Sequence, residues 1–115
     1  MIGIDVVDVA RLARALERAP GLEARLFTKA ERKYCRSKQD PATRFAGTLA
    51  AKEAVIKALR LGPLVAWAGR IEITRSDSGV PEARVQGRDE LVQLSISHDG
   101  GVAVAAALIL PLSQS

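Results

Sequence analysis

Glu53 and Lys57 lie one helical turn apart in the segment LAAKEAVIKAL, residues 49–59, which consists mostly of good helix formers. An isolated Glu–Lys pair with this spacing is an ordinary surface ion pair worth only a few tenths of a kcal/mol. At about 100° per residue, one side of this helix is an apolar stripe made by Phe45, Leu49, Ile56 and Leu59. Lys52 projects within that stripe. A lysine there predicts a cleft beside the helix that holds an anion.

Two more carboxylates stand close together near the N-terminus. Asp8 precedes an amphipathic run and has the residue type of a helix N-cap, whereas Asp5 lies in an alternating, strand-like segment and has no such role. A strand carboxylate that faced a helix carboxylate such as Glu53 could share a divalent cation with it. That cation is typically Mg²⁺, with substrate phosphates completing its ligand shell. In a chain with 13 acidic residues many such pairs are conceivable, so the spacing alone leaves this site a hypothesis.

The only histidine, His98, has serines and an aspartate as neighbours in the sequence SISHDGG. A Ser–His–Asp triad needs the right geometry rather than adjacency, and the chain lacks the G-x-S-x-G motif of a nucleophile elbow. We therefore interpret His98 as a residue at the end of a strand, next to a Gly-Gly turn, and not as part of a hydrolase site.

The composition restricts the possible partners. The formal charge of +4 and the pI of about 9.7 favour anionic partners, such as nucleic acid, phosphorylated ligands or acidic proteins. Nucleic acid is the least favoured of these, because the only aromatic residues are Phe27, Tyr34, Phe45 and Trp67, and no nucleic-acid-binding signature is present. One predicted helix face carries Arg11, Arg14 and Arg18, which is either a solvated face or a docking site for an acidic helix of a partner protein.

The periodicity predicts helices in the first half of the chain and strands in the second. A strand over residues 2–7 is expected to join that later sheet. Three helices follow: one in VARLARALER that ends at Pro20-Gly21, one in FTKAERKYC with a capping box of Thr28 and Glu31, and one from about Thr43 to Leu61. After a loop at LGPLVAWAG, RIEITRS and PEARV predict a hairpin, GRDELVQ is too short for more than about one helical turn, and LSIS and GVAVAAALIL predict two more strands. This order predicts an α+β fold with an antiparallel sheet packed against helices.

The chain length of 115 residues predicts a single domain, residues 1–115. The single cysteine, Cys35, excludes an internal disulfide and favours a reducing compartment, and no apolar run is long enough to span a membrane. We therefore expect a cytoplasmic protein with no membrane partner. The last run, GVAVAAALIL, is apolar on both faces, which predicts a central strand or a strand in a subunit interface.

Taken in order, the segments GIDVVDVARL, FTKAER, AAKEAVIKAL, RIEI…SGVP and LSISH resemble the holo-acyl-carrier-protein synthases, the small 4′-phosphopantetheinyl transferases. The resemblance spans nearly the whole chain, and GIDVVDVARL and AAKEAVIKAL carry most of it. It implies transfer of the 4′-phosphopantetheine arm of coenzyme A to a serine of an apo acyl carrier protein, with release of adenosine 3′,5′-bisphosphate. It also implies the fold of these transferases and a homotrimer with its sites between subunits.

The resemblance implies a role for each matching residue. Asp5 and Glu53 would hold Mg²⁺ together with the pyrophosphate of coenzyme A, and Lys57 would contact the phosphates and help the bisphosphate to leave. Glu53 would be the base for the incoming serine, either directly or through a metal-bound water. Asp8 matches the second acid of the first motif, Arg11 a contact to the acidic helix of the carrier protein, and Lys52, Ser95 and His98 positions beside the coenzyme A cleft.

The chain departs from the family pattern at Thr48, where family members usually carry an arginine on the phosphate-binding side. Arg44 lies four residues earlier on the same helix face, and we expect it to reach the same phosphate. The loop LGPLVAWAG lacks the usual glycine-rich form, and GRDELVQ is shorter than the helix of many relatives. An alternative function is therefore a module of the same fold that binds carrier proteins or coenzyme A with little transfer activity.

Overall fold

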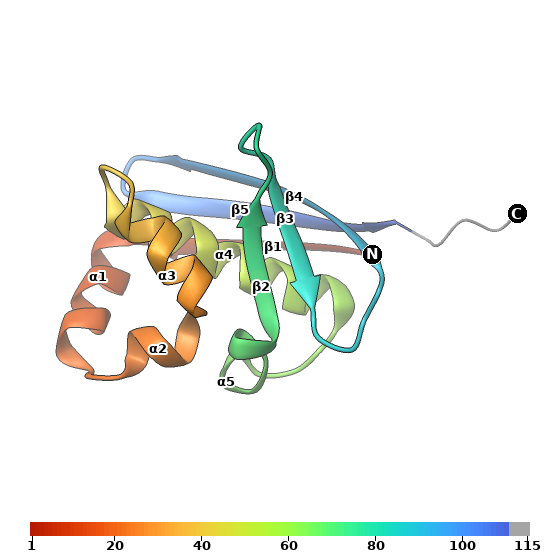
Figure 1. The fold of residues 1–115 in the computed structure, drawn as a ribbon, viewed down its shortest axis with the longest axis horizontal. Coiled ribbons are helices and arrows are strands. Elements are labelled where there is room, and N and C mark those ends of the chain that lie inside the picture. Colours follow the sequence, from red (N-terminus) through yellow and green to blue (C-terminus); the bar gives the residue numbers. More distant parts are fainter. Residues whose placement is uncertain (111–115) are drawn as a thin grey trace, which may run out of the picture.

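The computed structural model describes residues 1–110 of the chain (Figure 1). The helices are α1 (Val9–Arg18), α2 (Leu22–Leu26), α3 (Lys29–Arg36), α4 (Pro41–Leu59) and α5 (Leu64–Trp67), followed by the 3-10 turn η1 (Ala68–Arg70). The strands are β1 (Ile2–Asp8), β2 (Ile71–Arg75), β3 (Pro81–Val85), β4 (Leu91–Asp99) and β5 (Val102–Leu110). No helix in residues 1–110 is long and apolar enough to cross a membrane.

The five strands form one antiparallel sheet in the order β1-β5-β4-β3-β2. The predicted α+β class is therefore confirmed, and so is the prediction that the N-terminal strand joins the sheet. β5 lies between β1 and β4, which agrees with its apolar residues on both faces. The predicted hairpin of β2 and β3 is also present.

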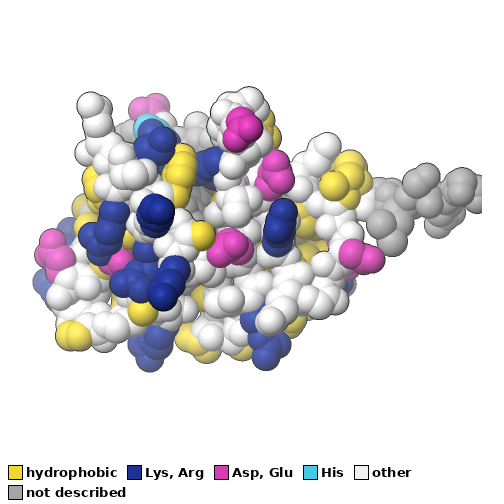
Figure 2. Space-filling view, viewed as in Figure 1, with side chains coloured by type: hydrophobic (Ala, Val, Ile, Leu, Met, Phe, Trp, Pro, Cys, Tyr) yellow, Lys and Arg dark blue, Asp and Glu magenta, His cyan; other side chains and the backbone are white. Residues whose placement is uncertain are grey.

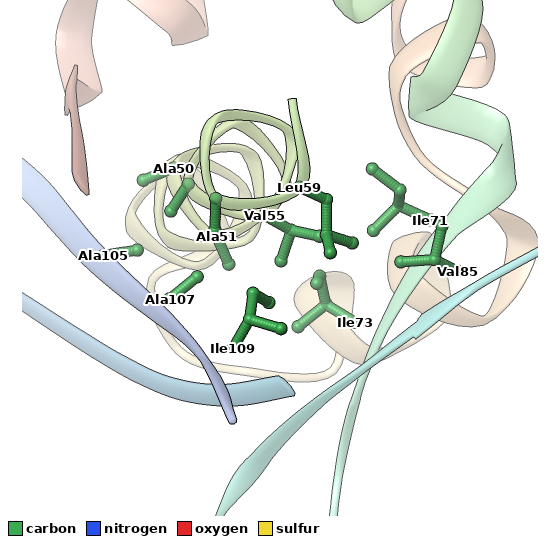
Figure 3. Packing of buried hydrophobic residues seen from close by; sticks show 12 residues of the cluster. Ala50, Ala51, Val55, Leu59, Ile71, Ile73, Val85, Ala105, Ala107 and Ile109 are labelled. Carbon is green, nitrogen blue, oxygen red and sulfur yellow. The ribbon is translucent and has the colours of Figure 1, made fainter. Parts of the chain in front are cut away.

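Helix α4 lies on one face of the sheet at short range because both surfaces consist of small residues. Ala103, Ala105 and Ala107 of β5 alternate toward the helix and are almost completely buried. Figure 3 shows Ala50 and Ala51 of α4 beside Ala105 and Ala107, with larger aliphatic side chains from β2, β3 and β5 filling the space farther along the helix. Because these side chains are small, the backbones of α4 and β5 approach each other closely, and the helix packs tightly on the sheet.

The opposite side of α4 is covered by α1, α2 and α3 and by the turn η1. Leu12 of α1, Leu26, Phe27 and Phe45 form the centre of this second cluster, and the Phe27 and Phe45 rings meet edge to face with centroids 4.8 Å apart. Because the sheet covers one side and the small helices the other, α4 is buried nearly all round from Phe45 to Lys52.

The outer face of the sheet, away from α4, is apolar and open. Alternation along β1 points Gly3, Asp5 and Val7 toward the helix and turns the larger apolar residues outward. The exposed fractions are 65% for Ile2, 54% for Ile4, 57% for Val6 and 40% for Leu108 of β5. A contiguous apolar sheet face of this kind is typical of a surface that contacts another protein.

Some predicted boundaries were wrong. α4 begins at Pro41 and ends at Leu59 rather than near 43 and 61, because Asp40 caps it and Arg60 takes a left-handed backbone conformation. The sequence did not predict α2 or α5, which have only five and four residues and so show no helical periodicity. The predicted strand LSIS is longer, because β4 begins at Leu91 and pairs along the whole of β5.

Candidate active site

Asp5 reaches α4 because β1 packs directly on that helix. A Cβ atom on Gly3 would lie 2.0 Å from the carbonyl oxygen of Ala54 and 2.8 Å from the nitrogen of Ala58, so only glycine fits this position. Asp5, two residues later on the same face of the strand, is therefore held against the next part of the helix. Its side chain is only 13% exposed.

Lys57 of α4 meets Asp5 and the backbone of β1. Its ammonium nitrogen Nζ lies 2.8 Å from Oδ1 of Asp5 and donates a second hydrogen bond to the carbonyl oxygen of Ile4 at 3.1 Å. The sequence predicted an ion pair of Lys57 with Glu53 as the ordinary interpretation of their spacing. That interpretation was wrong: in the part of the chain that the structure describes, the partner of Lys57 is the strand carboxylate.

Asp5 also affects the ionisation of Glu53 on α4. Burial and the neighbouring Asp5 carboxylate raise the pKa of Glu53 from 4.5 to about 7, against the opposing effect of Lys57. The hydrogen bond and charge of Asp5 raise the pKa of the Lys57 ammonium. A carboxyl group whose pKa is raised this far beside a second carboxylate is typical of sites that carry out acid–base or metal chemistry.

One atom of this cluster lacks a partner. Oδ2 of Asp5 is buried and accepts no hydrogen bond from the described residues, although buried carboxylate oxygens normally do. A divalent cation shared with Glu53 would satisfy this oxygen and would also neutralise the repulsion between the two carboxylates. Residues 1–110 hold no group of three or more His, Cys, Asp or Glu side chains that could form a complete protein cage for a metal. A pair of carboxylates that leaves other positions to substrate phosphates and water suits Mg²⁺.

An open cleft of about 600 Å³ leads to Glu53 between β1 and α1, and Asp8, Arg11 and Val102 also line it. Asp8 is the N-cap of α1, as predicted: its Oδ1 accepts a hydrogen bond from the backbone N–H of Arg11 at 2.9 Å. The cap fixes the start of α1 at the mouth of the cleft. Arg11, Arg14 and Arg18 are all exposed on this helix.

The comparisons with known proteins identify the family. A sequence model of the 4′-phosphopantetheinyl transferase superfamily matches residues 1–108. The chain belongs to this superfamily. It is 41% identical over 121 residues to a holo-[acyl-carrier-protein] synthase of Anaeromyxobacter dehalogenans, an alignment that covers 94% of this chain and 93% of that protein.

Solved structures of superfamily members have the same fold. The Helicobacter pylori holo-[acyl-carrier-protein] synthase in complex with coenzyme A superposes with a TM-score of 0.82 at 29% identity, covering 96% of this chain and all of that one. The Bacillus anthracis holo-(acyl-carrier-protein) synthase in complex with CoA (3′,5′-ADP) gives a TM-score of 0.81 at 31% identity, covering 94% and 93% of the two chains. The family resemblance seen in the sequence is therefore confirmed.

Lys52 does not line a cleft, and this contradicts its predicted place beside the coenzyme A cleft. The side chain has no exposed surface, and its Nζ lies 2.6 Å from Oε1 of Glu31. It also donates hydrogen bonds to the carbonyl oxygens of Leu26 at 2.8 Å and Ala68 at 2.6 Å. All three N–H groups of the ammonium thus have acceptors inside the protein, which leaves none for an external anion. Lys52 lies in the apolar stripe because the second core cluster covers that side of α4.

Thr48 is also enclosed, which contradicts its predicted place in the coenzyme A site. It is 2% exposed, and its hydroxyl donates to the carbonyl oxygen of Arg44 at 2.9 Å and lies 3.6 Å from Sγ of Cys35. Arg44, one turn earlier, is half-buried and lines a cleft together with His98. Burial raises the pKa of the Cys35 thiol, so this buried cysteine is an inert part of the core.

Ser95 and His98 lie on opposite faces of β4. The alternation of the strand puts His98 on the same side as Ile96, near Arg44, whereas Ser95 lines a shallow groove with Ile2 and Leu108 on the outer face. The two residues therefore do not belong to one cleft within a single chain. The separation also removes the geometric basis for a Ser95–His98 nucleophile pair.

The sequence interpretation missed two features that shape the site. Gly3 was treated as an ordinary strand residue, although a glycine within a strand pattern indicates close backbone approach and could have predicted the contact with α4. Glu31 was recognised only as part of the capping box, yet its Oε2 also accepts a hydrogen bond from the backbone N–H of Ile73 at 2.7 Å. No local pattern indicates that second role, because Ile73 lies far away in the chain.

Proposed function

We propose that the chain is a holo-[acyl-carrier-protein] synthase that transfers the 4′-phosphopantetheine arm of coenzyme A to a serine of an apo acyl carrier protein. The observation that carries this proposal is the ion pair of Asp5 with Lys57 next to Glu53, whose side chain lines an open cleft. Such a cluster supplies cation ligands and a phosphate-binding ammonium, which are the main requirements of phosphoryl transfer. The names of the relatives, and the coenzyme A complexes of two of them, support the same reaction.

Asp5 and Glu53 hold Mg²⁺ in this proposal. The fit rests on the unpartnered Oδ2 of Asp5 and on the raised pKa of Glu53, both of which are relieved by a cation. When bound, Mg²⁺ supplies neutralisation of the charge on the pyrophosphate of coenzyme A. Lys57 has an exposed side chain on a flexible stem, so its ammonium can turn from Asp5 toward a phosphate oxygen.

The serine hydroxyl of the carrier protein forms a bond to the phosphorus that carries the pantetheine arm. The bond from that phosphorus to the bridging oxygen breaks, and adenosine 3′,5′-bisphosphate leaves with the electron pair. Lys57 stabilises the negative charge that develops on this leaving group. Glu53 is the proposed acceptor of the serine proton, because its carboxylate lines the cleft that the serine would enter.

The carrier protein docks on α1 in this proposal. Arg11 lies at the cleft, and Arg14 and Arg18 continue the basic face of the exposed helix. Figure 2 shows that basic side chains also gather over the neighbouring short helices. A basic surface beside the cleft is complementary to an acidic helix and would guide such a partner to Glu53.

We also propose a homotrimer, with each site between two subunits, and a cytoplasmic location. Two features support shared sites: the exposed apolar outer face of β1 and β5, and the positions of Arg44 and Glu53 on α4. These two residues are nine positions apart, which is about 13 Å along the axis and about half a turn around it. Within one chain they face opposite sides of the helix, so a ligand that used both would contact two subunits.

A transfer assay tests the proposed function. The protein is incubated with coenzyme A, Mg²⁺ and several apo acyl carrier proteins, and the mass of each carrier is followed. We expect one carrier to gain the mass of the phosphopantetheine arm, and we expect Glu53→Gln and Asp5→Asn to abolish the gain while they leave the fold intact. Coenzyme A binding without transfer to any carrier would instead favour the binding-module alternative.

A further inference from the structure

Lys52 and Glu31 form a buried polar network on the side of α4 that faces the small helices. Their exposed fractions are 0% and 1%. The ammonium of Lys52 lies 2.6 Å from Oε1 of Glu31 and donates hydrogen bonds to the backbone carbonyl oxygens of Leu26, at the end of α2, and Ala68, at the start of η1. One side chain of α4 is therefore bound to three separate segments at once.

Glu31 connects this network to the sheet. Its Oε1 accepts the hydrogen bond of the capping box from the backbone N–H of Thr28 at 2.8 Å, and its Oε2 accepts one from the backbone N–H of Ile73 in β2 at 2.7 Å. The carboxylate is thus held by the first turn of α3 and by β2. All three acceptors of the lysine consequently have defined positions, since two are backbone atoms and the third is fixed by backbone N–H groups.

The net stability of a buried ion pair does not by itself account for this network. Desolvation of the two charges offsets most of their attraction, so an apolar pair of similar volume is often as stabilising or more so. A polar network in which every group has a partner specifies a single arrangement of the elements it joins. The ammonium of Lys52 meets this condition, because each of its three N–H groups has an acceptor. The network therefore acts on the orientation of α4.

The sheet side of α4 does little to fix the rotation of the helix at this level. Ala50 and Ala51 lie there beside Ala105 and Ala107 of β5 (Figure 3), and such short side chains do not interlock as longer ones do. Apolar contact is also non-directional, whereas hydrogen bonds are directional. Lys52 follows this alanine pair directly in the sequence. Its network is therefore the feature that sets the rotation of α4 about its axis here.

Glu53 is the residue that this rotation places. It follows Lys52, so its side chain projects about 100° farther around the helix, where it lines the open cleft beside α1. A side-chain atom about 6 Å from the helix axis moves by about 2 Å when the helix rotates by about 20°. A displacement of about 1 Å at a reacting group can reduce a rate by about 100-fold. A small rotational error in α4 would therefore be costly at Glu53 even while the helix stays folded.

We infer that Lys52 is a positioning residue of the active site: held by Glu31 and two backbone carbonyl oxygens, it fixes the rotation of α4 and thereby the place of the Glu53 carboxylate in the cleft. This inference rests on the proposed function, because that function defines the reaction for which Glu53 must be placed. It also gives a role to the lysine that the sequence puts within the apolar stripe of the helix.

Transfer kinetics of the double variant Glu31→Gln, Lys52→Met test the inference. The variant removes both charges and leaves side chains of similar size, and circular dichroism shows whether it is folded at the assay temperature. At saturating Mg²⁺ we expect kcat to fall by about 10- to 100-fold and the KM of coenzyme A to stay within about 2-fold of wild type. Without nucleotide, the affinity for Mn²⁺ measured by electron paramagnetic resonance should fall by about 10-fold, because Glu53 is displaced.

Glu31→Asp keeps the test decisive if the double variant does not fold. It retains both charges but shortens the carboxylate by one methylene group, so the lysine must follow an acceptor that has moved. We expect a loss in kcat of about 3- to 10-fold, again with little change in the KM of coenzyme A. An unchanged kcat in the folded double variant, or in Glu31→Asp where the double variant is unfolded, would overturn the inference. A raised KM with unchanged kcat would also overturn it.

Ile109→Ala is the matched control for loss of stability. Ile109 is buried in the cluster between α4 and the sheet and takes no part in the network, so its truncation lowers the urea midpoint by leaving a cavity. It should leave kcat and the affinity for Mn²⁺ close to those of wild type. An equal loss of kcat in Ile109→Ala and in the double variant would mean a general effect of destabilisation and would overturn the inference.

The Mn²⁺ titration separates failure of the inference from failure of the proposed function, because it needs no transfer. If wild type transfers the phosphopantetheine arm and the folded variants keep its kcat and its affinity for Mn²⁺, only the role of Lys52 is wrong. If wild type transfers the arm to no carrier protein, the proposed function is wrong. A weaker affinity for Mn²⁺ in the double variant would then still support the placement of Glu53 by Lys52.

Discussion

The ammonium of Lys57 lies 2.8 Å from Oδ1 of Asp5, so a protein cation already occupies one oxygen of the proposed metal ligand. The other oxygen, Oδ2, is buried without a partner. Lys57 and a divalent cation therefore compete for Asp5, and binding of Mg²⁺ requires the lysine to share or leave that carboxylate. An ammonium released in this way becomes available for a phosphate oxygen.

We expect Lys57→Met to bind Mn²⁺, a spectroscopic substitute for Mg²⁺, about 5- to 10-fold more tightly than wild type when no nucleotide is present. The reason is that the variant loses a positive charge at the metal ligand. Electron paramagnetic resonance titration measures this directly. Coenzyme A transfer should fall at the same time, because a phosphate contact is lost. Equal or weaker Mn²⁺ affinity in the variant would contradict competition for Asp5.

Glu53 should make the stability of the metal-free protein depend on pH. Its pKa is raised from 4.5 to about 7 in the folded chain, so its protonated form is favoured by folding. The resulting stabilisation is complete below about pH 4.5 and is lost as the pH rises through about 7. We therefore expect the melting temperature to fall over this window. Glu53→Gln should flatten the profile, and an unchanged slope in that variant would assign the effect to another group.

Substitution of Gly3 should damage both the fold and the site. In Gly3→Ala the new methyl group would meet the backbone of Ala54 at 2.0 Å, so β1 must move away from α4. We expect a loss of about 1–3 kcal/mol in the free energy of unfolding, measured in urea, and a larger fractional loss of transfer activity because Asp5 moves with the strand. Gly69→Ala is the control, since a Cβ atom there meets nothing within 4 Å. Equal stability of the two variants would contradict the close packing.

The buried pair of Lys52 and Glu31 should matter for stability rather than for substrate affinity. Lys52→Met leaves the Glu31 carboxylate unpaired in the core, a change that typically costs about 3–5 kcal/mol. The double variant Glu31→Gln, Lys52→Met removes both charges and should recover part of this loss in urea unfolding. Lys33→Met, at an exposed lysine with no carboxylate partner among residues 1–110, should have little effect on unfolding. A double variant no more stable than Lys52→Met alone would argue against the unpaired charge as the cause.

A charge on the outer sheet face should dissociate the proposed trimer. Ile4 is 54% exposed at the centre of the apolar face of β1, so Ile4→Lys would bury a charge in any interface formed there. Sedimentation analysis should then give the 12.3 kDa mass of a single chain instead of a multiple of it. Val65→Lys, at an 86% exposed position on α5, is the control and should leave the assembly unchanged. Unaltered assembly in Ile4→Lys would place the interface elsewhere.

Local patterns were sufficient for most of the fold. Asp8 as the N-cap of α1, the capping box of Thr28 and Glu31, and the apolar strand β5 at the centre of the sheet could all be predicted, because each depends on residues close in sequence. The motifs around Asp5 and Glu53 were sufficient to name the family. The one-turn helices α2 and α5 were missed because four or five residues carry no measurable period.

The partners of the charged side chains were decided only by tertiary structure. The spacing of Glu53 and Lys57 favoured a pair within α4, but Gly3 brings β1 close enough for Asp5 to take Lys57 instead. Lys52 was expected at a cleft, yet Glu31, 21 residues earlier in the sequence, encloses it in the core. The sequence determined the identity of each group and the face of the element on which it stands. Which groups meet depends on backbone packing between distant segments, and that packing is a property of the folded chain alone.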